Sequence, residues 1–221
     1  MLKLYEHPLS PYVQKVKVAL MEKGIPFETE IPDILSGGSA EFAATNPRLE
    51  IPALIDGDIK VFDSTIILEY LDERVPKPAL FPAGAAERAR CRILEDLGDT
   101  LLAPNLGVLV REVLLKPDPS TRDAAAVAQT KAELSRQYQR LDRELSKREY
   151  LCGEFSVADI SCFSPINIAS LMEGAPSPEF GNVAKWLSRM SNRPSVARYL
   201  AEFSEATAPL RASSQPASAH A

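Results

Sequence analysis

The chain has 221 residues, of which 45% are hydrophobic and 25% are charged, a composition that is typical of a globular protein and excludes a disordered or fibrous one. The formal net charge is −5, and the basic residues are scattered among acidic ones, which argues against a nucleic-acid partner. A chain of this length buries roughly 70% of the surface that its unfolded form exposes, so its core needs neither a disulfide nor a metal ion.

The sequence also indicates a cellular compartment. The N-terminus enters a strand pattern at once, without the basic and apolar segments of a signal peptide, and no run of about 18 apolar residues occurs. The three cysteines, Cys91, Cys152 and Cys162, form no CxxC or Cys/His pattern, which is typical of free thiols in a reducing compartment. We therefore expect a cytoplasmic protein with no membrane partner and no metal site.

Strand and helix periodicities alternate over the first part of the chain. Two apolar runs flank Asp56-Gly57, which is a hairpin signal, and Pro76 and Pro78 end the helical pattern that follows. In chain order we predict a strand over 2–6, a helix over 11–23, a strand over 27–31, a short helix over 40–45, strands over 52–55 and 59–62, and a helix over 64–75. This βαβαββα order predicts an α/β domain over residues 1–78.

Only helical periodicity remains from residue 87 onward. Residues 79–86, which are rich in proline and lack periodicity, are the expected linker, and residues 87–207 are the expected all-helical domain. Pro104 interrupts the first long helical pattern and predicts a kink there. Residues 208–221 are rich in alanine, serine and proline, and we expect a disordered tail.

Ser10 lies between the first strand and the first helix, directly before Pro11. Serine is a favoured N-cap and proline a favoured first helical residue, so helix capping explains both. The same position allows a second interpretation, because the N–H groups and the positive end of a helix dipole stabilise an anion such as a thiolate. The local residues do not decide between the two interpretations.

Asp63 and Ser64 occupy the equivalent place before the last helix of the α/β domain. Capping is again the local explanation, but ligands gather at the carboxyl ends of strands, and two such junctions with hydroxyl groups in one small domain suggest a shared ligand. A zwitterion fits, since Ser64 can bind a carboxylate and Asp63 an amino group. Ile51-Pro52 precedes the hairpin, and because cis bonds are a small minority before proline, the sequence does not predict the isomer of this bond.

Five short motifs follow one another along the chain. They are Lys3-Leu4-Tyr5 with Leu9-Ser10-Pro11-Tyr12, Asn46-Pro47 leading to Ile51-Pro52-Ala53-Leu54, Asp56-Gly57-Asp58, Asp63-Ser64, and Phe155-Ser156-Val157-Ala158-Asp159-Ile160. In this order they resemble the successive landmarks of the soluble glutathione S-transferase family, in its serine-type, bacterial, phi- or theta-like form. The resemblance spans both predicted domains and implies a thioredoxin-like βαβαββα domain followed by an all-helical domain, usually in a homodimer.

The resemblance implies a role for each matching residue in the α/β domain. Ser10 matches the catalytic serine, whose hydroxyl donates a hydrogen bond to the glutathione sulfur and favours the thiolate, which is the nucleophile. Ile51 matches the residue whose backbone pairs with the cysteinyl part of glutathione, and Pro52 matches the cis-proline that follows it. Ser64 and Asp63 match the pair that holds the γ-glutamyl carboxylate and amino group.

Other positions matter for the second substrate and for packing. The second-substrate pocket is expected between the domains, with Tyr12, Leu106, Val110 and Arg111 as candidates, although an apolar stripe at helical spacing is more often core. Tyr5 and Tyr12 are competing donors to the sulfur, but strand alternation places Tyr5 in the core. We assign Ser156 and Asp159, by contrast, to the capping box of a core helix.

The sequence departs from the family pattern at the glycine end of glutathione. Leu49-Glu50 stands where the family often has Gly-Lys or Gly-Gln, and residues 39–42 lack the usual basic side chains. Glu50 can still bind through its backbone, but its carboxylate repels a ligand carboxylate unless it is oriented away. Weak or altered glutathione binding is therefore one expectation.

These observations lead to one expected function and two alternatives. We expect a glutathione transferase that uses glutathione as co-substrate, without a metal, and adds its thiolate to a small, largely apolar electrophile. A glutathione-dependent isomerase or dehalogenase of a small metabolite would use the same thiolate. A non-catalytic binding protein that keeps the fold and has lost glutathione recognition is the third hypothesis.

Overall fold

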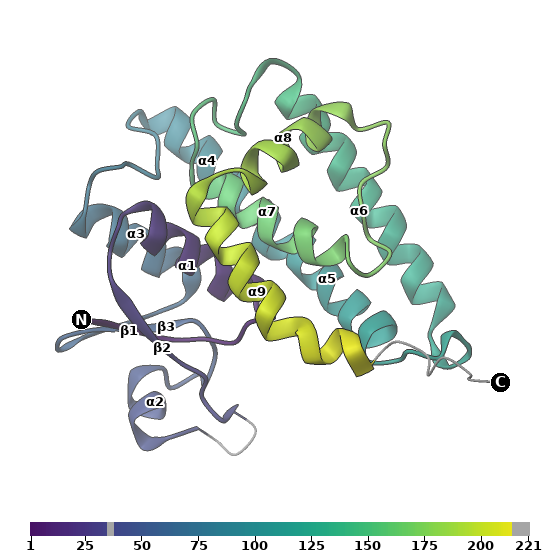
Figure 1. The fold of residues 1–221 in the computed structure, drawn as a ribbon. Coiled ribbons are helices and arrows are strands. Elements are labelled where there is room, and N and C mark those ends of the chain that lie inside the picture. The colour runs from purple at the N-terminus through teal and green to yellow at the C-terminus, as the bar shows by residue number, and fades with distance from the viewer. Residues whose placement is uncertain (35–37, 214–221) are drawn as a thin grey trace.

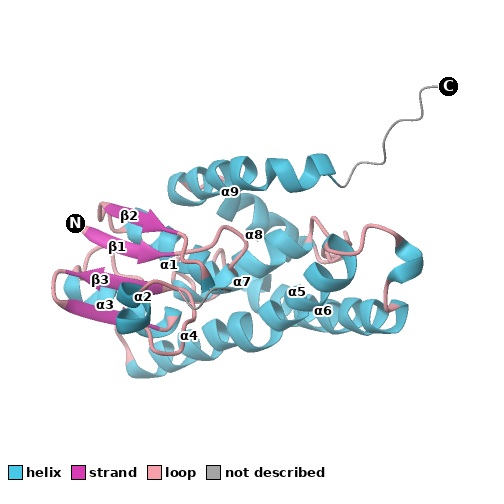
Figure 2. Ribbon diagram, turned by 90° about the horizontal axis from the view of Figure 1, so that it is seen from below, coloured by secondary structure: helices cyan, strands magenta, loops and turns pink. Residues whose placement is uncertain are grey.

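A four-stranded sheet forms one end of the molecule in this computed structural model, which describes residues 1–34 and 38–213 (Figures 1 and 2). The strand order is β2-β1-β3-β4. β1 and β2 are parallel, while β3 pairs antiparallel with β1 and, across the Asp56-Gly57 turn, with β4. The strands are β1 (Leu2–Tyr5), β2 (Phe27–Glu30), β3 (Ala53–Asp56) and β4 (Ile59–Phe62).

Three helices complete the α/β domain and confirm the predicted βαβαββα order: α1 (Pro11–Glu22), α2 (Ala40–Thr45) and α3 (Ser64–Arg74). α1 and α3 cover the sheet face that carries Leu4, and α2 covers the face that carries Tyr5. The two faces follow from strand geometry, because successive side chains point to opposite sides. Tyr5 therefore packs against Phe42 of α2, with ring centroids 4.8 Å apart.

From residue 85 to residue 213 the chain is mostly helical, as predicted. Its helices are α4 (Ala85–Leu97), α5 (Ala103–Leu109), α6 (Ala124–Glu144), α7 (Val157–Ala169), α8 (Gly181–Ser191) and α9 (Pro194–Ser213). Among the described residues, no helix is both long and apolar enough to cross a membrane.

Two boundaries differ from the expected ones. α4 begins at Ala85 and not at residue 87. α9 continues to Ser213, so the expectation of disorder from residue 208 is wrong for residues 208–213. The physical reason is that buried Phe203 and Thr207 anchor the last turns while alanine, a strong helix former, continues them. Residues 214–221 lie outside the described part of the chain.

The predicted interruption at Pro104 takes the form of wider helical turns. π-helical stretches, Gly98–Leu102 and Val110–Leu114, precede and follow α5. A π turn accommodates an extra residue and is one of the recognised causes of a bend in a helix. Pro104 lies in the first turn of α5, where the missing N–H of proline costs least. Gly98 also lets α4 approach α7, because a Cβ there would lie 2.6 Å from the Ser161 carbonyl oxygen.

The three cysteines are free thiols with different environments. Cys91 and Cys162 are buried, whereas Cys152 is only half-buried. Burial raises the pKa of Cys162 well above its ordinary value, so this thiol stays protonated and unreactive.

α7 forms the centre of the helical domain, and all but one of its 13 residues are buried. The predicted capping box is confirmed at its N-terminus, where Asp159 accepts a hydrogen bond from the Ser156 N–H at 3.0 Å. The same carboxylate also accepts from the Leu151 N–H and from Trp186 Nε1, each at 2.9 Å. One buried side chain thus satisfies donors from three segments.

Replacing Asp159 with alanine should therefore destabilise the whole helical domain. Each buried donor that loses its acceptor costs about 1–3 kcal/mol, so we expect the free energy of unfolding of Asp159→Ala to fall by at least about 3 kcal/mol. Urea denaturation measures this loss. Asp58→Ala, which changes an exposed hairpin residue, is the control. Equal stability of the two variants would contradict this account of the helical core.

Candidate functional site

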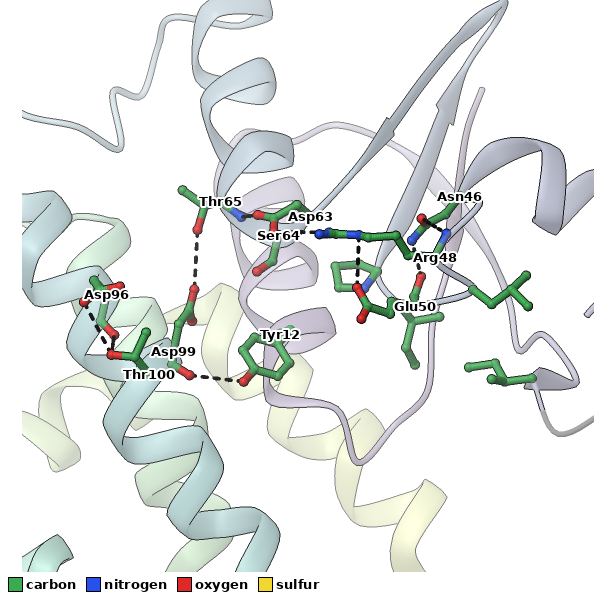
Figure 3. Close-up of a pocket in the computed structure, with 14 residues that line it drawn as sticks. Tyr12, Asn46, Arg48, Glu50, Asp63, Ser64, Thr65, Asp96, Asp99 and Thr100 are labelled. Atoms are coloured by element: carbon green, nitrogen blue, oxygen red, sulfur yellow. Dashed lines mark hydrogen bonds and ion pairs between the residues drawn. The ribbon is translucent and has the colours of Figure 1, made fainter. Parts of the chain in front are cut away.

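A cavity of about 710 Å³ opens between the loop before β3, the N-terminus of α3 and the α4 side of the helical domain (Figure 3). It is the place where several predicted site residues come together. Most of the residues that line it are polar, and acidic side chains outnumber basic ones. The lining residues are Tyr12, Ile34, Asn46, Arg48, Leu49, Glu50, Ile51, Pro52, Asp63, Ser64, Thr65, Asp96, Asp99 and Thr100.

The loop before β3 supplies one wall of this cavity. Asn46 is fully buried and braces the loop, since its amide donates to the Glu50 carbonyl at 2.7 Å and its Oδ1 accepts from the Arg48 N–H at 3.0 Å. The Ile51–Pro52 peptide bond is cis. The pairing of β3 with β1 ends at Ala53 opposite Tyr5, and its pairing with β4 ends at Ala53 opposite Phe62. No strand residue therefore lies opposite Ile51. The backbone of Ile51 is placed to pair with an extended ligand.

The N-terminus of α3 supplies a second wall. Asp63 caps the helix, because its Oδ1 accepts from the Thr65 N–H at 3.0 Å and from the Ile66 N–H at 3.5 Å. Its φ of +73° is unfavourable for a residue with a Cβ, and such a conformation persists only where the surroundings impose it. Ser64 is the first residue of α3, and its hydroxyl has no partner in the described structure. A free hydroxyl at a helix N-terminus is suited to a carboxylate.

Arg48 lies between the two acidic residues of this cavity (Figure 3). Its guanidinium is 3.2 Å from the Glu50 carboxylate and 3.4 Å from the Asp63 carboxylate. It also lies over the Phe62 ring, 5.2 Å from the centroid. The cavity therefore contains a cation near Glu50, which the sequence analysis did not identify.

Ser10 is the N-cap of α1, as the first interpretation predicts. Its Oγ accepts from the Val13 N–H at 3.3 Å, and its hydroxyl hydrogen has no protein acceptor within the described ranges. Ser10 does not line the cavity, but Tyr12 of the same helix does. Capping through the oxygen leaves the hydroxyl hydrogen of Ser10 available for a further bond, so the two interpretations are compatible.

The two tyrosines near Ser10 already have partners. The Tyr12 hydroxyl donates to the Asp99 carbonyl at 3.1 Å, and burial together with the Asp99 charge raises the pKa of Tyr12. Burial likewise raises the pKa of Tyr5, whose hydroxyl donates to Glu41 at 3.0 Å. Tyr5 is fully buried in the core, which agrees with the prediction from strand alternation.

The three residues predicted from α5 and the following turn do not line this cavity. Leu106 is 2% exposed and belongs to the core of the helical domain, so its side chain faces other helices. Val110 also packs against that core, while Arg111 is exposed and pairs with Glu112 at 3.2 Å. The helical periodicity of this segment reflects core packing and not the cavity described here.

A buried polar network joins the cavity to the helical domain. The Lys15 ammonium, on a side chain only 1% exposed, lies 2.8 Å from Glu95 and 2.5 Å from Asp99. Thr65, next to Ser64, donates to Glu95 at 2.7 Å, and Ser161 of α7 donates to Asp99 at 3.0 Å. Helices α1, α3, α4 and α7 thus meet around one ammonium group.

Comparison with known proteins agrees with this geometry. Residues 4–79 match the model of the glutathione S-transferase N-terminal domain, and residues 102–194 match that of the C-terminal domain. The chain is 35% identical to Glutathione S-transferase 3 of Zea mays over 164 residues, which are 72% of this chain and 73% of the relative. The chain belongs to the glutathione S-transferase family.

A solved glutathione S-transferase from Rhodospirillum rubrum F11 has the same fold, with 30% identity and a TM-score of 0.82 over 90% of this chain and 92% of that one. The family also has relatives with other names. A Stringent starvation protein A homolog of Coxiella burnetii is 40% identical over 91 residues, which are 41% of this chain and 43% of the relative.

Within this glutathione S-transferase fold, sequence reasoning missed the contribution of Lys15. The helical pattern of α1 shows an apolar face, but α1 is buried on a second face as well, where Lys15 and Gln14 meet the helical domain. Lys15 stands four residues before the core residue Ala19, so the two lie on the same face of the helix. This spacing was the signal in the sequence that Lys15 is buried. Arg48 gave no comparable signal, because a loop has no periodicity.

Removing the Lys15 charge should destabilise the protein strongly. Lys15→Met leaves the Glu95 carboxylate buried without a counter-charge, and breaking a buried pair in this way costs about 3–5 kcal/mol. We expect the double variant Lys15→Met/Glu95→Gln to recover much of this loss in chemical denaturation. Lys185→Met, at an exposed position of α8, is the control. A single variant as stable as this control would contradict the role of the network.

Proposed function

We propose that this family member is a glutathione transferase that binds glutathione in the cavity described above and adds its thiolate to a small electrophile. The observation that carries the proposal is the convergence of Glu50, Ile51, Pro52, Asp63 and Ser64 on one cavity. The resemblance assigns Ile51, Pro52, Asp63 and Ser64 to glutathione, and Glu50 is expected to bind through its backbone. These residues come from two separate segments of the chain.

Each part of glutathione has a matching group in this proposal. The Ser64 hydroxyl and the N-terminus of α3 receive the γ-glutamyl carboxylate, and Asp63 faces the amino group. The backbone of Ile51, before cis-Pro52, pairs with the cysteinyl residue. Arg48 is the basic group for the glycine carboxylate. Its guanidinium also pairs with the Glu50 carboxylate, which partly neutralises this acidic side chain.

Ser10 supplies the chemistry. The oxygen of its hydroxyl caps α1 by accepting from Val13, and the hydrogen donates to the glutathione sulfur. The sulfur then lies near the N-terminus of α1, where the helix dipole favours a negative charge. Both effects stabilise the thiolate relative to the thiol and lower the pKa of the bound ligand. The protein also holds both reactants at attack distance, which lowers the barrier further.

The second substrate would bind in the cleft next to Tyr12. Serine at position 10, where a cysteine would favour mixed disulfides, favours conjugation. A glutathione-dependent isomerase or dehalogenase would use the same thiolate but would regenerate or oxidise glutathione. Product analysis separates these reactions, because only conjugation leaves glutathione covalently bound to the product.

A non-catalytic role is the second candidate function. The pairing of Arg48 with two carboxylates of its own chain favours it. A protein of this kind would keep the fold without binding glutathione. Absence of glutathione binding at millimolar concentration would support this role and contradict the transferase proposal.

We further propose a cytoplasmic homodimer that needs no metal cofactor. Ile66 of α3 and Ile93 of α4 are 56% and 58% exposed, and large apolar side chains at that exposure are suited to a subunit interface. The ion pair between Arg92 and Glu69, 2.6 Å apart, links the same two helices and would contribute polar contacts there.

Replacing Ser10 with alanine should raise the pKa of bound glutathione. A hydrogen bond to a charged group contributes about 1.5–3 kcal/mol, which corresponds to roughly one to two pKa units of the thiol. The ultraviolet absorbance of the bound thiolate, followed against pH, measures the shift, and kcat/KM at neutral pH should fall in parallel.

A matched control separates catalysis from capping. Ser39 caps α2 in the same way, with its Oγ accepting from the Phe42 N–H at 3.1 Å, but it does not line the cavity. Ser39→Ala should leave the pKa of bound glutathione unchanged. If Ser10→Ala binds glutathione with an unchanged thiol pKa, Ser10 is a cap and not the catalytic group.

Replacing Ser64 with alanine should weaken glutathione binding and leave the thiol pKa nearly unchanged. Loss of one hydrogen bond to a carboxylate predicts an increase in Kd of roughly tenfold. Calorimetric titration measures the affinity, with Ser135→Ala on the exposed face of α6 as control. Unchanged affinity would place the γ-glutamyl end elsewhere.

A further inference from the structure

A second cavity, of about 470 Å³, lies between the end of β1, one side of α1 and α9. It shares no lining residue with the first cavity. Figure 2 shows α9 extending along the outside of the molecule, where it passes from the α/β domain to the helical domain. The residues that line this second cavity are Glu6, His7, Pro8, Val13, Gln14, Lys17, Thr29, Tyr199, Glu202, Phe203, Glu205 and Ala206.

Two buried polar side chains distinguish this cavity. Within the described ranges, the Tyr199 hydroxyl has no hydrogen-bond partner, and Glu6 Oε2 has the ion-pair contact with Lys17 at 3.0 Å. Glu6 is 7% exposed and Tyr199 is 2% exposed, and both line the second cavity. Buried polar atoms are nearly always hydrogen-bonded, so the Tyr199 hydroxyl indicates a missing partner molecule.

The charges around the cavity define the partner. Glu6 and Glu202 lie on either side of Lys17, whose ammonium is 3.0 Å from a carboxylate oxygen of each. Lys17 contacts Glu6 through Oε2, and a carboxylate oxygen can accept a second hydrogen bond. Glu205 adds a third carboxylate, and Arg198 pairs with Glu202 at 3.1 Å, so three acidic groups are offset by two cations. The excess negative charge favours a cation.

The remaining groups restrict the shape of this cation. The imidazole of His7 already accepts from the Leu9 N–H at 3.2 Å, and the Gln14 amide donates to the Pro8 carbonyl at 3.0 Å. Apolar surface from Pro8, Val13 and Phe203 lines the space between the polar atoms. An aliphatic chain matches these walls better than a hydrated metal ion does.

We propose that the second cavity binds an aliphatic primary amine of the diamine class in its ammonium form. One ammonium group donates hydrogen bonds to Glu6 Oε2 and to the Tyr199 oxygen, and the methylene chain packs against Pro8, Val13 and Phe203. The second ammonium group points towards Glu202 and Glu205 on α9. This site is independent of glutathione, because it uses none of the residues that the proposed transferase reaction requires.

The first test compares two probes of the same length by calorimetric titration into the full chain. Putrescine, 1,4-diaminobutane, carries two ammonium groups, and 1,4-butanediol carries two neutral hydroxyls. We expect saturable binding of putrescine and at least about tenfold weaker binding of the diol. Equal binding of both probes, or no binding of putrescine, would overturn the proposal and leave bound water as the partner of both oxygens.

Variants locate the site. Glu6→Gln and Tyr199→Phe should each weaken putrescine binding by about tenfold. Glu28→Gln, which changes an exposed carboxylate of β2 outside the cavity, should not affect it. Asp96→Asn tests the first cavity. If Asp96→Asn weakens binding while Glu6→Gln does not, putrescine occupies the first cavity and the proposal fails.

Two tyrosines provide a test that compares thermal stability without and with the ligand. Tyr138 and Tyr199 are both 2% exposed, but the Tyr138 hydroxyl donates to the Gly174 carbonyl at 2.7 Å, whereas the Tyr199 hydroxyl has no partner. Without putrescine, Tyr138→Phe should lower Tm and Tyr199→Phe should not. With putrescine, only Tyr199→Phe should reduce the ligand-induced rise in Tm. A Tyr199→Phe variant as unstable as Tyr138→Phe would show that the hydroxyl has a structural partner.

Discussion

The buried ammonium of Lys15 is the constraint on which the arrangement of the two domains depends. A lysine at 1% exposure is stable only when acceptors surround it. Here they are Thr65 of α3, Glu95 of α4 and Asp99 in the π-helical stretch after α4, and Asp99 also accepts from Ser161 of α7. The interface between the domains is therefore determined by polar geometry as well as by apolar area. Because Thr65 belongs to this network, the N-terminus of α3 cannot move independently of the helical domain.

This constraint explains why the candidate site lies at a junction of elements. The N-terminus of α1 carries Ser10, that of α3 carries Ser64, and the loop before β3 carries the cis peptide bond at Pro52. Each helix end offers N–H groups and a partial positive charge to an anionic ligand. The Lys15 network fixes α1 and α3 relative to each other, so both helix ends are organised before any ligand binds.

The electrostatics of the two cavities differ in a way that bears on their ligands. In the first cavity Arg48 pairs with Glu50 and Asp63. A ligand that carries two carboxylates and an amino group can form ion pairs with these side chains in place of the pairs that they form with one another. In the second cavity three carboxylates exceed the two cations that pair with them, Lys17 and Arg198, and the Tyr199 hydroxyl has no partner. The first arrangement suits a zwitterion of net negative charge, and the second suits a cation.

The sequence by itself determined the order of elements, because strand alternation, the Asp56-Gly57 turn and the proline stops act locally. It also located the helix N-caps at Ser10 and Asp63 and the capping box at Ser156 and Asp159, since capping depends on neighbouring residues. It did not determine the isomer of the Ile51–Pro52 bond, the place of Arg48 in the cavity or the burial of Lys15. It left Leu106 open between core and pocket, and the structure places its side chain in the core of the helical domain. Those features depend on contacts between segments far apart in the chain, and only the tertiary structure decides which groups meet there.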